Sequence, residues 1–152
     1  MKKILLTITI IAWILIIYFL SSNNYFTTNN LSYATADTII TITNKLNITN
    51  ISPDEREFAI IKMNYPLRKI AHVIEYFILS VLIYNILKYI RKEKNNYLLT
   101  FVICFIFALA DEYHQTLISG RTGQFSDCLI DMIGCIICLS IAKLIKMTRK
   151  KL

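Results

Sequence analysis

The chain has 152 residues, of which 55% are hydrophobic, and its mean hydropathy is +0.51. This composition excludes an ordinary soluble domain, and the length predicts a single domain over residues 1–152. The net charge of +7 does not indicate nucleic acid binding, because the basic residues flank apolar runs and do not gather on one soluble face. We therefore expect a membrane domain whose main contact is the lipid bilayer.

Four apolar runs are candidates to cross a bilayer, since a helix needs about 20 largely apolar residues to span the hydrocarbon core. The sequence predicts transmembrane helices at about 4–20, 68–90, 97–117 and 125–146. The third reaches the required length only if Asp111, Glu112, His114 and Gln115 form its last turns. The expected fold is therefore all-α, a four-transmembrane-helix bundle, in a multi-pass protein of the cell membrane.

The basic residues predict the orientation of this bundle. They lie before the first run, between the second and third, and after the fourth, as Lys2, Lys3, Lys88, Arg91, Lys92, Lys94, Lys143, Lys146, Arg149, Lys150 and Lys151. Lys and Arg accumulate in cytoplasmic segments. We therefore expect both termini to be cytoplasmic, with the loop 21–67 and the loop around Gly120 facing outwards.

The first run resembles a signal peptide, with basic residues before an apolar stretch, but no pair of small residues follows it at cleavage distance. We expect residues 1–20 to remain as an anchor. Residues 23–52 are rich in Thr and Asn, and their apolar residues have a loosely helical spacing: Leu31, Ala34, Ile39, Ile42 and Leu46. This spacing predicts a helix that lies on the outer interface or dips into it.

The segment Ser52-Pro53-Asp54-Glu55 is typical of a helix start, with a capping Ser, Pro at the first helical position and Glu at the third. It predicts a short helix over about residues 53–63, which Pro66 ends just before the second span. Two interpretations of this short outer helix remain open at this point: a solvated connector and a lid over a substrate.

Polar residues recur on one face of three predicted spans. Spacings of three and four residues unite Arg68, His72, Glu75 and Tyr76 on the second span, Asp111, His114 and Gln115 on the third, and Asp127 and Asp131 on the fourth. Counting about 1.5 Å per residue places Glu75, Asp111 and Asp131 at similar depths below the outer surface. Ionisable groups at such depth predict a functional site, although they could also serve only to hold the helices together.

The loop between the third and fourth spans, SGRTGQ, contains the glycines of a tight turn and one arginine. The guanidinium of Arg121 is a rigid fork that suits a carboxylate or a phosphate. The alternative is that Arg121 pairs with Asp127.

Taken in order, these motifs resemble the VanZ-like family. They are Arg68-Lys69-x-x-His72-x-x-Glu75-Tyr76, Asp111-Glu112-x-x-Gln115, Gly120-Arg121-x-Gly123 and Asp127-x-x-x-Asp131-x-x-Gly134, preceded by Ser21-Ser22 after the first run. The resemblance implies a small four-helix bacterial membrane protein, in a family named for a member that lowers susceptibility to the glycopeptide teicoplanin. It implies no particular reaction.

The outer cluster holds three fixed cations, Arg68, Lys69 and Arg121, against five acids, Glu75, Asp111, Glu112, Asp127 and Asp131. Two acids must therefore share a proton, accept charge from His72 or His114, or bind a cation. A shared proton suits general acid–base chemistry. A divalent metal suits several carboxylates with a histidine, and a cationic ligand suits binding without chemistry.

Three functions follow from this cluster. The first is binding: the outward-facing polar site engages a lipid-linked envelope precursor or a lipoglycopeptide and lowers drug access. The second is a membrane-embedded hydrolase or transferase acting on a lipid-linked or cell-wall intermediate, with Glu75, Asp111 or Asp131 as the base and Arg68 and Arg121 holding phosphate. The third is a purely structural helix bundle. The full set of candidate binding residues is Arg68, Lys69, His72, Glu75, Tyr76, Asp111, Glu112, His114, Gln115, Arg121, Asp127 and Asp131.

Overall fold

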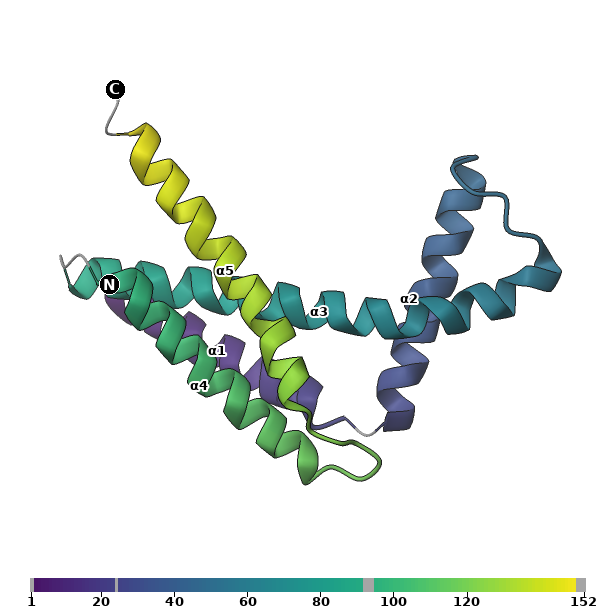
Figure 1. Cartoon of the computed structure of the whole chain (residues 1–152), viewed down its shortest axis with the longest axis horizontal. Coiled ribbons are helices and arrows are strands. Elements are labelled where there is room, and N and C mark those ends of the chain that lie inside the picture. Colours follow the sequence, from purple (N-terminus) through teal and green to yellow (C-terminus); the bar gives the residue numbers. More distant parts are fainter. Residues whose placement is uncertain (1, 24, 92–94, 150–152) are drawn as a thin grey trace.

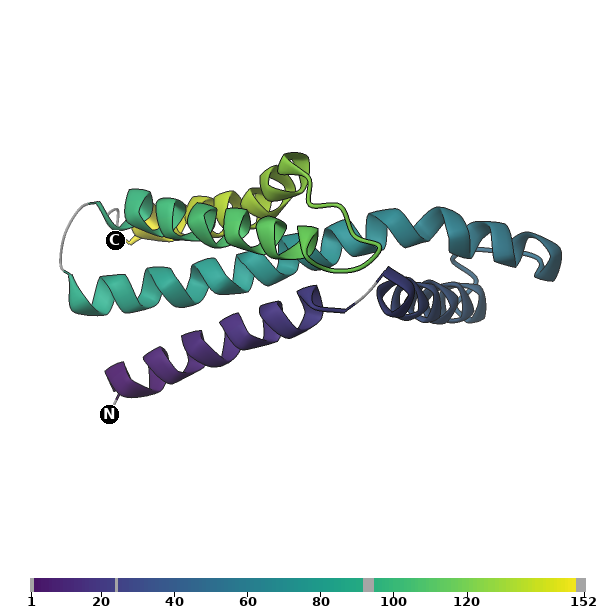
Figure 2. The ribbon, with the colours of Figure 1, turned by 90° about the horizontal axis from the view of Figure 1, so that it is seen from below.

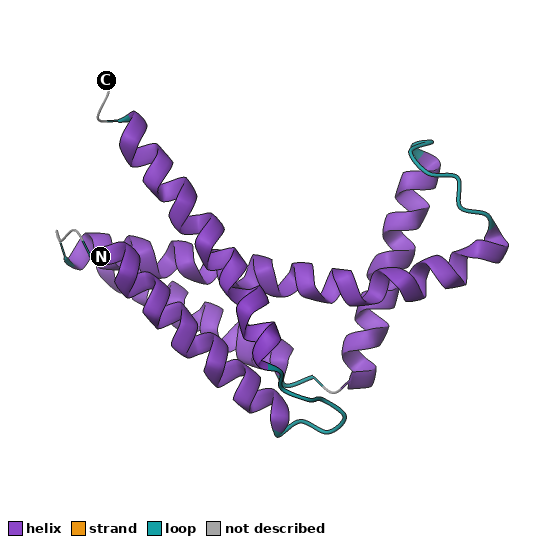
Figure 3. Cartoon of the chain, viewed as in Figure 1, coloured by secondary structure: helices purple, strands orange, loops and turns teal. Residues whose placement is uncertain are grey.

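The computed structural model describes residues 2–23, 25–91 and 95–149, which form five helices and no strand (Figure 3). The helices are α1 (Lys2–Ser21), α2 (Tyr25–Lys45), α3 (Pro53–Ile90), α4 (Asn96–Thr116) and α5 (Phe125–Thr148). By length and composition, α1, α3, α4 and α5 can each cross a membrane. The prediction of an all-α protein with four apolar spans is thereby confirmed.

The second span differs from the prediction, because α3 continues through Pro66 as one helix of 38 residues. Its length is about 57 Å at 1.5 Å per residue, nearly twice the thickness of a hydrocarbon core of about 30 Å. Proline removes a single intrahelical hydrogen bond, and α2 braces α3 on both sides of that position. The Asn29 side chain accepts a hydrogen bond from Asn64 at 3.2 Å and one from Arg68 at 3.5 Å. The predicted stop at Pro66 was therefore wrong.

The start of α3 is as predicted. The Glu55 carboxylate accepts hydrogen bonds from the Ser52 backbone N–H at 3.2 Å and from the Ser52 hydroxyl at 2.8 Å. These bonds satisfy donors that the first turn of a helix otherwise leaves without an intrahelical partner. The helix therefore begins at Pro53 for a local reason that the sequence already contains.

Helix α2 forms in the segment where a helix was predicted, and apolar residues of the predicted face are exposed. Leu31 and Ile42 are 61% and 51% exposed. The buried side chains, spaced by three and four residues, are Asn29, Ser32, Ala36 and Ile40. Two polar and two apolar side chains thus form the buried face of α2, and a second, apolar face is left exposed, as a helix at a lipid interface requires.

One ion pair fastens the far end of α2 to α3. Arg56 Nε donates to Asp37 Oδ1 at 2.7 Å, and the same guanidinium reaches the hydroxyl of Thr41 at 2.5 Å. The hydrogen bond from Arg56 lowers the pKa of the Asp37 carboxyl below its ordinary value. Helix α2 and the first half of α3 therefore pack together as a pair beside the other helices (Figure 1).

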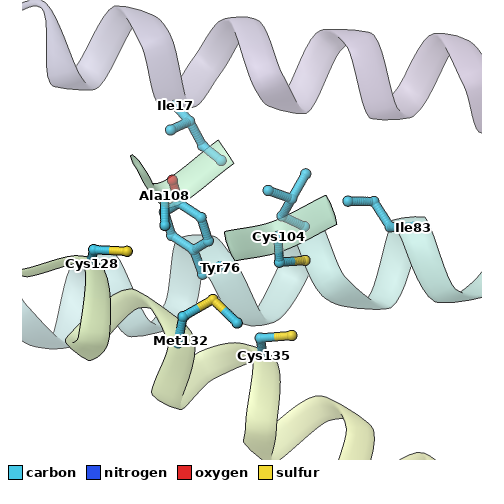
Figure 4. Close-up of a cluster of buried hydrophobic side chains, with 9 residues drawn as sticks. Ile17, Tyr76, Ile83, Cys104, Ala108, Cys128, Met132 and Cys135 are labelled. Atoms are coloured by element: carbon cyan, nitrogen blue, oxygen red, sulfur yellow. The ribbon is translucent and has the colours of Figure 1, made fainter. Parts of the chain in front are cut away.

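The bundle itself is organised by the crossing of α5 over α3 (Figure 1). At Gly134 the two backbones touch: a Cβ there would overlap the Val73 carbonyl oxygen and lie 2.7 Å from the Phe77 nitrogen. Small residues allow such close approach between membrane helices. Around the crossing, a core of buried side chains joins α1, α3, α4 and α5, and Tyr76 is one of its fully buried members (Figure 4).

Basic residues gather at one end of the bundle. The start of α1, the end of α3, the start of α4 and the end of α5 lie at one end (Figures 1 and 2). The described basic residues of those segments are Lys2, Lys3, Lys88, Arg91, Lys143, Lys146 and Arg149, whereas Lys92, Lys94, Lys150 and Lys151 lie outside the described residues. The loop 117–124 lies at the opposite end, with the start of α5.

Candidate functional site

The polar residues of three spans meet near the start of α5. His72 of α3, Asp111 of α4 and Asp131 of α5 each offer one ligand atom, and these three atoms lie within 4.8 Å of one another. Asp111 and Asp131, predicted to lie at similar depths, thus belong to one cluster. The crossing of α5 over α3, with Gly134 one helical turn beyond Asp131, allows this approach.

Asp131 and His72 form the centre of the cluster. His72 Nδ1 lies 3.4 Å from Asp131 Oδ1 and 3.7 Å from Glu75 Oε2. Asp131 is completely buried, and neither of its carboxylate oxygens has a hydrogen-bond partner among the described residues. The same holds for His72 Nδ1 within that part of the chain. Burying polar atoms without a partner is costly, so this centre has unused binding capacity.

The neighbouring acids of α4 are held by defined partners. Gln115 Nε2 donates to Asp111 Oδ2 at 3.0 Å and approaches Glu112 Oε1 at 3.5 Å. Glu112 Oε2 also accepts the backbone N–H of Gln124 at 2.8 Å, which ties the loop 117–124 to α4. Only glycine fits at position 123, since a Cβ there would overlap the Glu112 carbonyl oxygen. Asp111 is therefore oriented by Gln115, while Glu112 shapes the loop.

The cations of the cluster have separate partners. Lys69 Nζ pairs with Asp127 Oδ1 at 2.5 Å. Arg121 Nη1 donates to the carbonyl of Ser21 at 2.6 Å and Nη2 to the Thr28 hydroxyl at 3.4 Å. Burial lowers the pKa of Arg121 from its ordinary value, although a guanidinium remains charged at neutral pH. The pairing of Arg121 with Asp127 that the sequence left open is not found among the described residues.

A pocket of about 190 Å³ lies between α2, α3 and the end of α1. Arg68, Arg121, His72 and Glu75 are its ionisable lining residues, and hydroxyl-bearing residues of α2 line another part of its wall: Thr27, Thr28, Ser32 and Thr35. Two guanidinium groups and several hydroxyls suit an anionic group such as a phosphate. The pocket is smaller than the roughly 300–1,000 Å³ of typical drug-sized sites, so it fits a headgroup and not a whole glycopeptide.

His114 lies apart from the central cluster, although it shares a helix face with Asp111 in the sequence. Its ring stacks on Tyr18 with centroids 4.5 Å apart, and Nε2 lies 3.1 Å from the Ser22 hydroxyl oxygen. Beside it, a second cavity of about 320 Å³ between α1 and α4 is lined mainly by apolar residues and reaches Asp111. Tyr76 also lines this cavity, and its hydroxyl has no partner in the described part of the chain.

The contribution of α2 was missed by sequence reasoning. Thr28 and Asn29 contact the two arginines of the pocket, yet the prediction followed the apolar residues of this segment. The buried set Asn29, Ser32, Ala36 and Ile40 has the spacing of one helix face. That signal was present, but two of these four residues are polar, and polar residues do not stand out when burial is sought from hydrophobicity.

Fold and site together define a helical membrane protein with four apolar spans and a buried polar cluster shared by three of them. A family model described as VanZ/LLP1 matches residues 6–146, nearly the whole chain. The chain belongs to the VanZ/LLP1 family, as its motifs predicted. No curated protein and no solved structure matches it.

Proposed function

We propose that this VanZ-like protein resides in the cell membrane and binds a phosphate-bearing, lipid-linked envelope component at an outward-facing site, thereby lowering teicoplanin susceptibility. The observation that carries the proposal is the pocket between α2, α3 and α1, which Arg68 and Arg121 line together with hydroxyl-bearing residues of α2. Arg121 Nε has no hydrogen-bond partner among the described residues. A phosphate held there gains charge-assisted hydrogen bonds from planar guanidinium donors.

The apolar cavity near Asp111 supports an amphiphilic ligand. It lies between α1 and α4, and Ile14, Ile17, Leu79 and Phe107 are among its lining residues. The headgroup pocket and this cavity adjoin the polar cluster from different sides, since His72 lines the former and Asp111 the latter. A lipid-linked molecule offers both a charged headgroup and an apolar tail, whereas a soluble sugar phosphate offers only the first.

The test is the teicoplanin and vancomycin susceptibility of a sensitive Gram-positive host that expresses the protein. We expect wild type to protect selectively against teicoplanin. Arg121→Gln should return susceptibility to the level of the empty vector, because loss of hydrogen bonds to a charged group weakens binding by about tenfold to a hundredfold. Lys62→Gln, which removes a cation from an exposed position on α3, should protect like wild type.

Membrane levels of all variants are matched by immunoblotting, and Arg121→Lys distinguishes the role of the planar fork from that of charge. If wild type does not change susceptibility, the resistance role does not extend to this chain. Equal protection by wild type and Arg121→Gln would instead place the function outside the pocket and would favour a structural role for the cluster.

The outward orientation is supported by the accumulation of basic residues at one end of the bundle, since such residues remain cytoplasmic. All four native cysteines are buried, so a single introduced cysteine can be labelled selectively. In intact cells, a membrane-impermeant maleimide should label Thr122→Cys in the exposed loop 117–124. It should label Thr148→Cys at the end of α5 only after permeabilisation, and the reverse result would invert the proposed topology.

A second candidate is a membrane-embedded hydrolase or transferase acting on the same class of ligand. It is favoured by the contact of His72 with the buried Asp131, because a histidine beside a carboxylate can move a proton during catalysis. Release of phosphate or of a headgroup from a lipid-linked phosphate by purified protein would favour this candidate over binding alone. Binding is the first candidate because the residues that line the pocket are sufficient to hold a phosphate, whereas catalysis requires a further proton transfer.

A further inference from the structure

We propose that His72, Asp111 and Asp131 form a binding site for a divalent transition-metal cation, Zn²⁺ or Mn²⁺. One residue comes from each of α3, α4 and α5, so the site exists only where the three helices meet. Binding of the ion at these three side chains does not require the envelope ligand proposed above.

The spacing of the ligand atoms fits a shared ion. Two ligands that each lie 2.0–2.1 Å from a tetrahedral ion are about 3.4 Å apart, and His72 Nδ1 lies 3.4 Å from Asp131 Oδ1. That separation exceeds the 2.7–2.9 Å of a charge-assisted N–H···O hydrogen bond. The third ligand atom, from Asp111, lies within 4.8 Å of the other two, close enough to reach the ion through a side-chain rotation.

The lack of hydrogen-bond partners around Asp131 is an independent argument for a bound cation. Its side chain is 1% exposed, and neither oxygen has a hydrogen-bond partner among the described residues. The Lys69 ammonium is engaged with Asp127, and Arg121 donates to Ser21 and Thr28. A buried carboxylate at membrane depth needs a compensating charge, and a cation between Asp131, His72 and Asp111 supplies it.

The donor set determines the class of ion. Imidazole nitrogen suits Zn²⁺, and the two carboxylates also suit Mn²⁺, whereas Mg²⁺ and Ca²⁺ prefer sites composed only of oxygens. Gln115 Nε2 holds Asp111 Oδ2 at 3.0 Å, as an outer partner that orients a ligating carboxylate. Three protein ligands leave a coordination position open. Because His72 also lines the headgroup pocket, a phosphate could occupy that position, and this last step alone rests on the proposed function.

The experiment is metal binding by the full chain, purified in detergent without a polyhistidine tag and stripped with a chelator. Titration with Zn²⁺ or Mn²⁺ should give one ion per wild-type chain and a higher melting temperature, and Mg²⁺ should bind far more weakly. His72→Gln and Asp131→Asn should each lower affinity at least about tenfold. His114→Gln is the matched control, because the chain has two histidines and His114 contacts Ser22 and Tyr18.

A milder variant covers the case in which replacing a ligand prevents folding. Gln115→Leu keeps all three ligands but releases Asp111, and affinity should fall by about tenfold to a hundredfold. Substitution with Co²⁺ should also give a visible absorption band that changes in His72→Gln and not in His114→Gln. The site would be refuted if wild type bound no ion, or if Zn²⁺ bound equally well to wild type, His72→Gln and Gln115→Leu. Neither result depends on drug susceptibility, so failure here would leave the headgroup pocket standing.

Discussion

Replacing Gly134 with leucine should destabilise the protein more than any other single change in the bundle. The Cβ of any side chain at this position overlaps the carbonyl oxygen of Val73, which is backbone and cannot rotate away. Overpacking a filled core typically costs 1–3 kcal/mol, and we expect about 3 kcal/mol or more here because α5 must move off α3. The melting temperature in detergent measures the loss.

The matched control is Ser140→Leu on the same helix. It adds a side chain of the same kind at an exposed position, so it should leave the melting temperature nearly unchanged. Gly134→Ala should lie between leucine and wild type, because it introduces only the Cβ. A Gly134→Leu protein as stable as the Ser140 variant would show that α5 does not cross α3 at this position.

Replacing Lys69 with methionine should give the second largest loss. Lys69 and Asp127 join α3 to the first turn of α5 through a contact of 2.5 Å, and their side chains are 17% and 20% exposed. Methionine keeps much of the apolar stem but leaves the Asp127 carboxylate without its cation. Breaking a buried pair costs 3–5 kcal/mol, so for this partly exposed pair we expect about 2 kcal/mol, measured as a lower melting temperature. Lys62→Met, at an exposed position on α3, should have little effect.

Charge reversal tests whether the pair itself is responsible. Lys69→Asp combined with Asp127→Lys should recover part of the stability lost in Lys69→Asp alone. Recovery should be incomplete, because the reversal places a cation at the N-terminal end of α5, where the helix dipole favours an anion. Strictly additive single effects in this double-mutant cycle would exclude a direct interaction.

The sequence by itself determined which parts of the chain can enter a membrane and which polar residues within them are candidates for a site. Both follow from local properties: an apolar run of about 20 residues is a span in any arrangement, and an acid within such a run is costly wherever it lies. The start of α3 is equally local, since Ser52 and Glu55 satisfy each other across one turn.

The tertiary structure decided which of these residues meet. Helical spacing identifies which residues share one face of a helix, but not which other helix packs against that face. It therefore grouped His114 with Asp111, whereas the packed helices place His72 beside Asp131 and His114 beside Tyr18. The same limit explains the error outside the cluster. Asn29 of α2 accepts hydrogen bonds from residues on either side of Pro66, and this contact joins segments far apart in the chain.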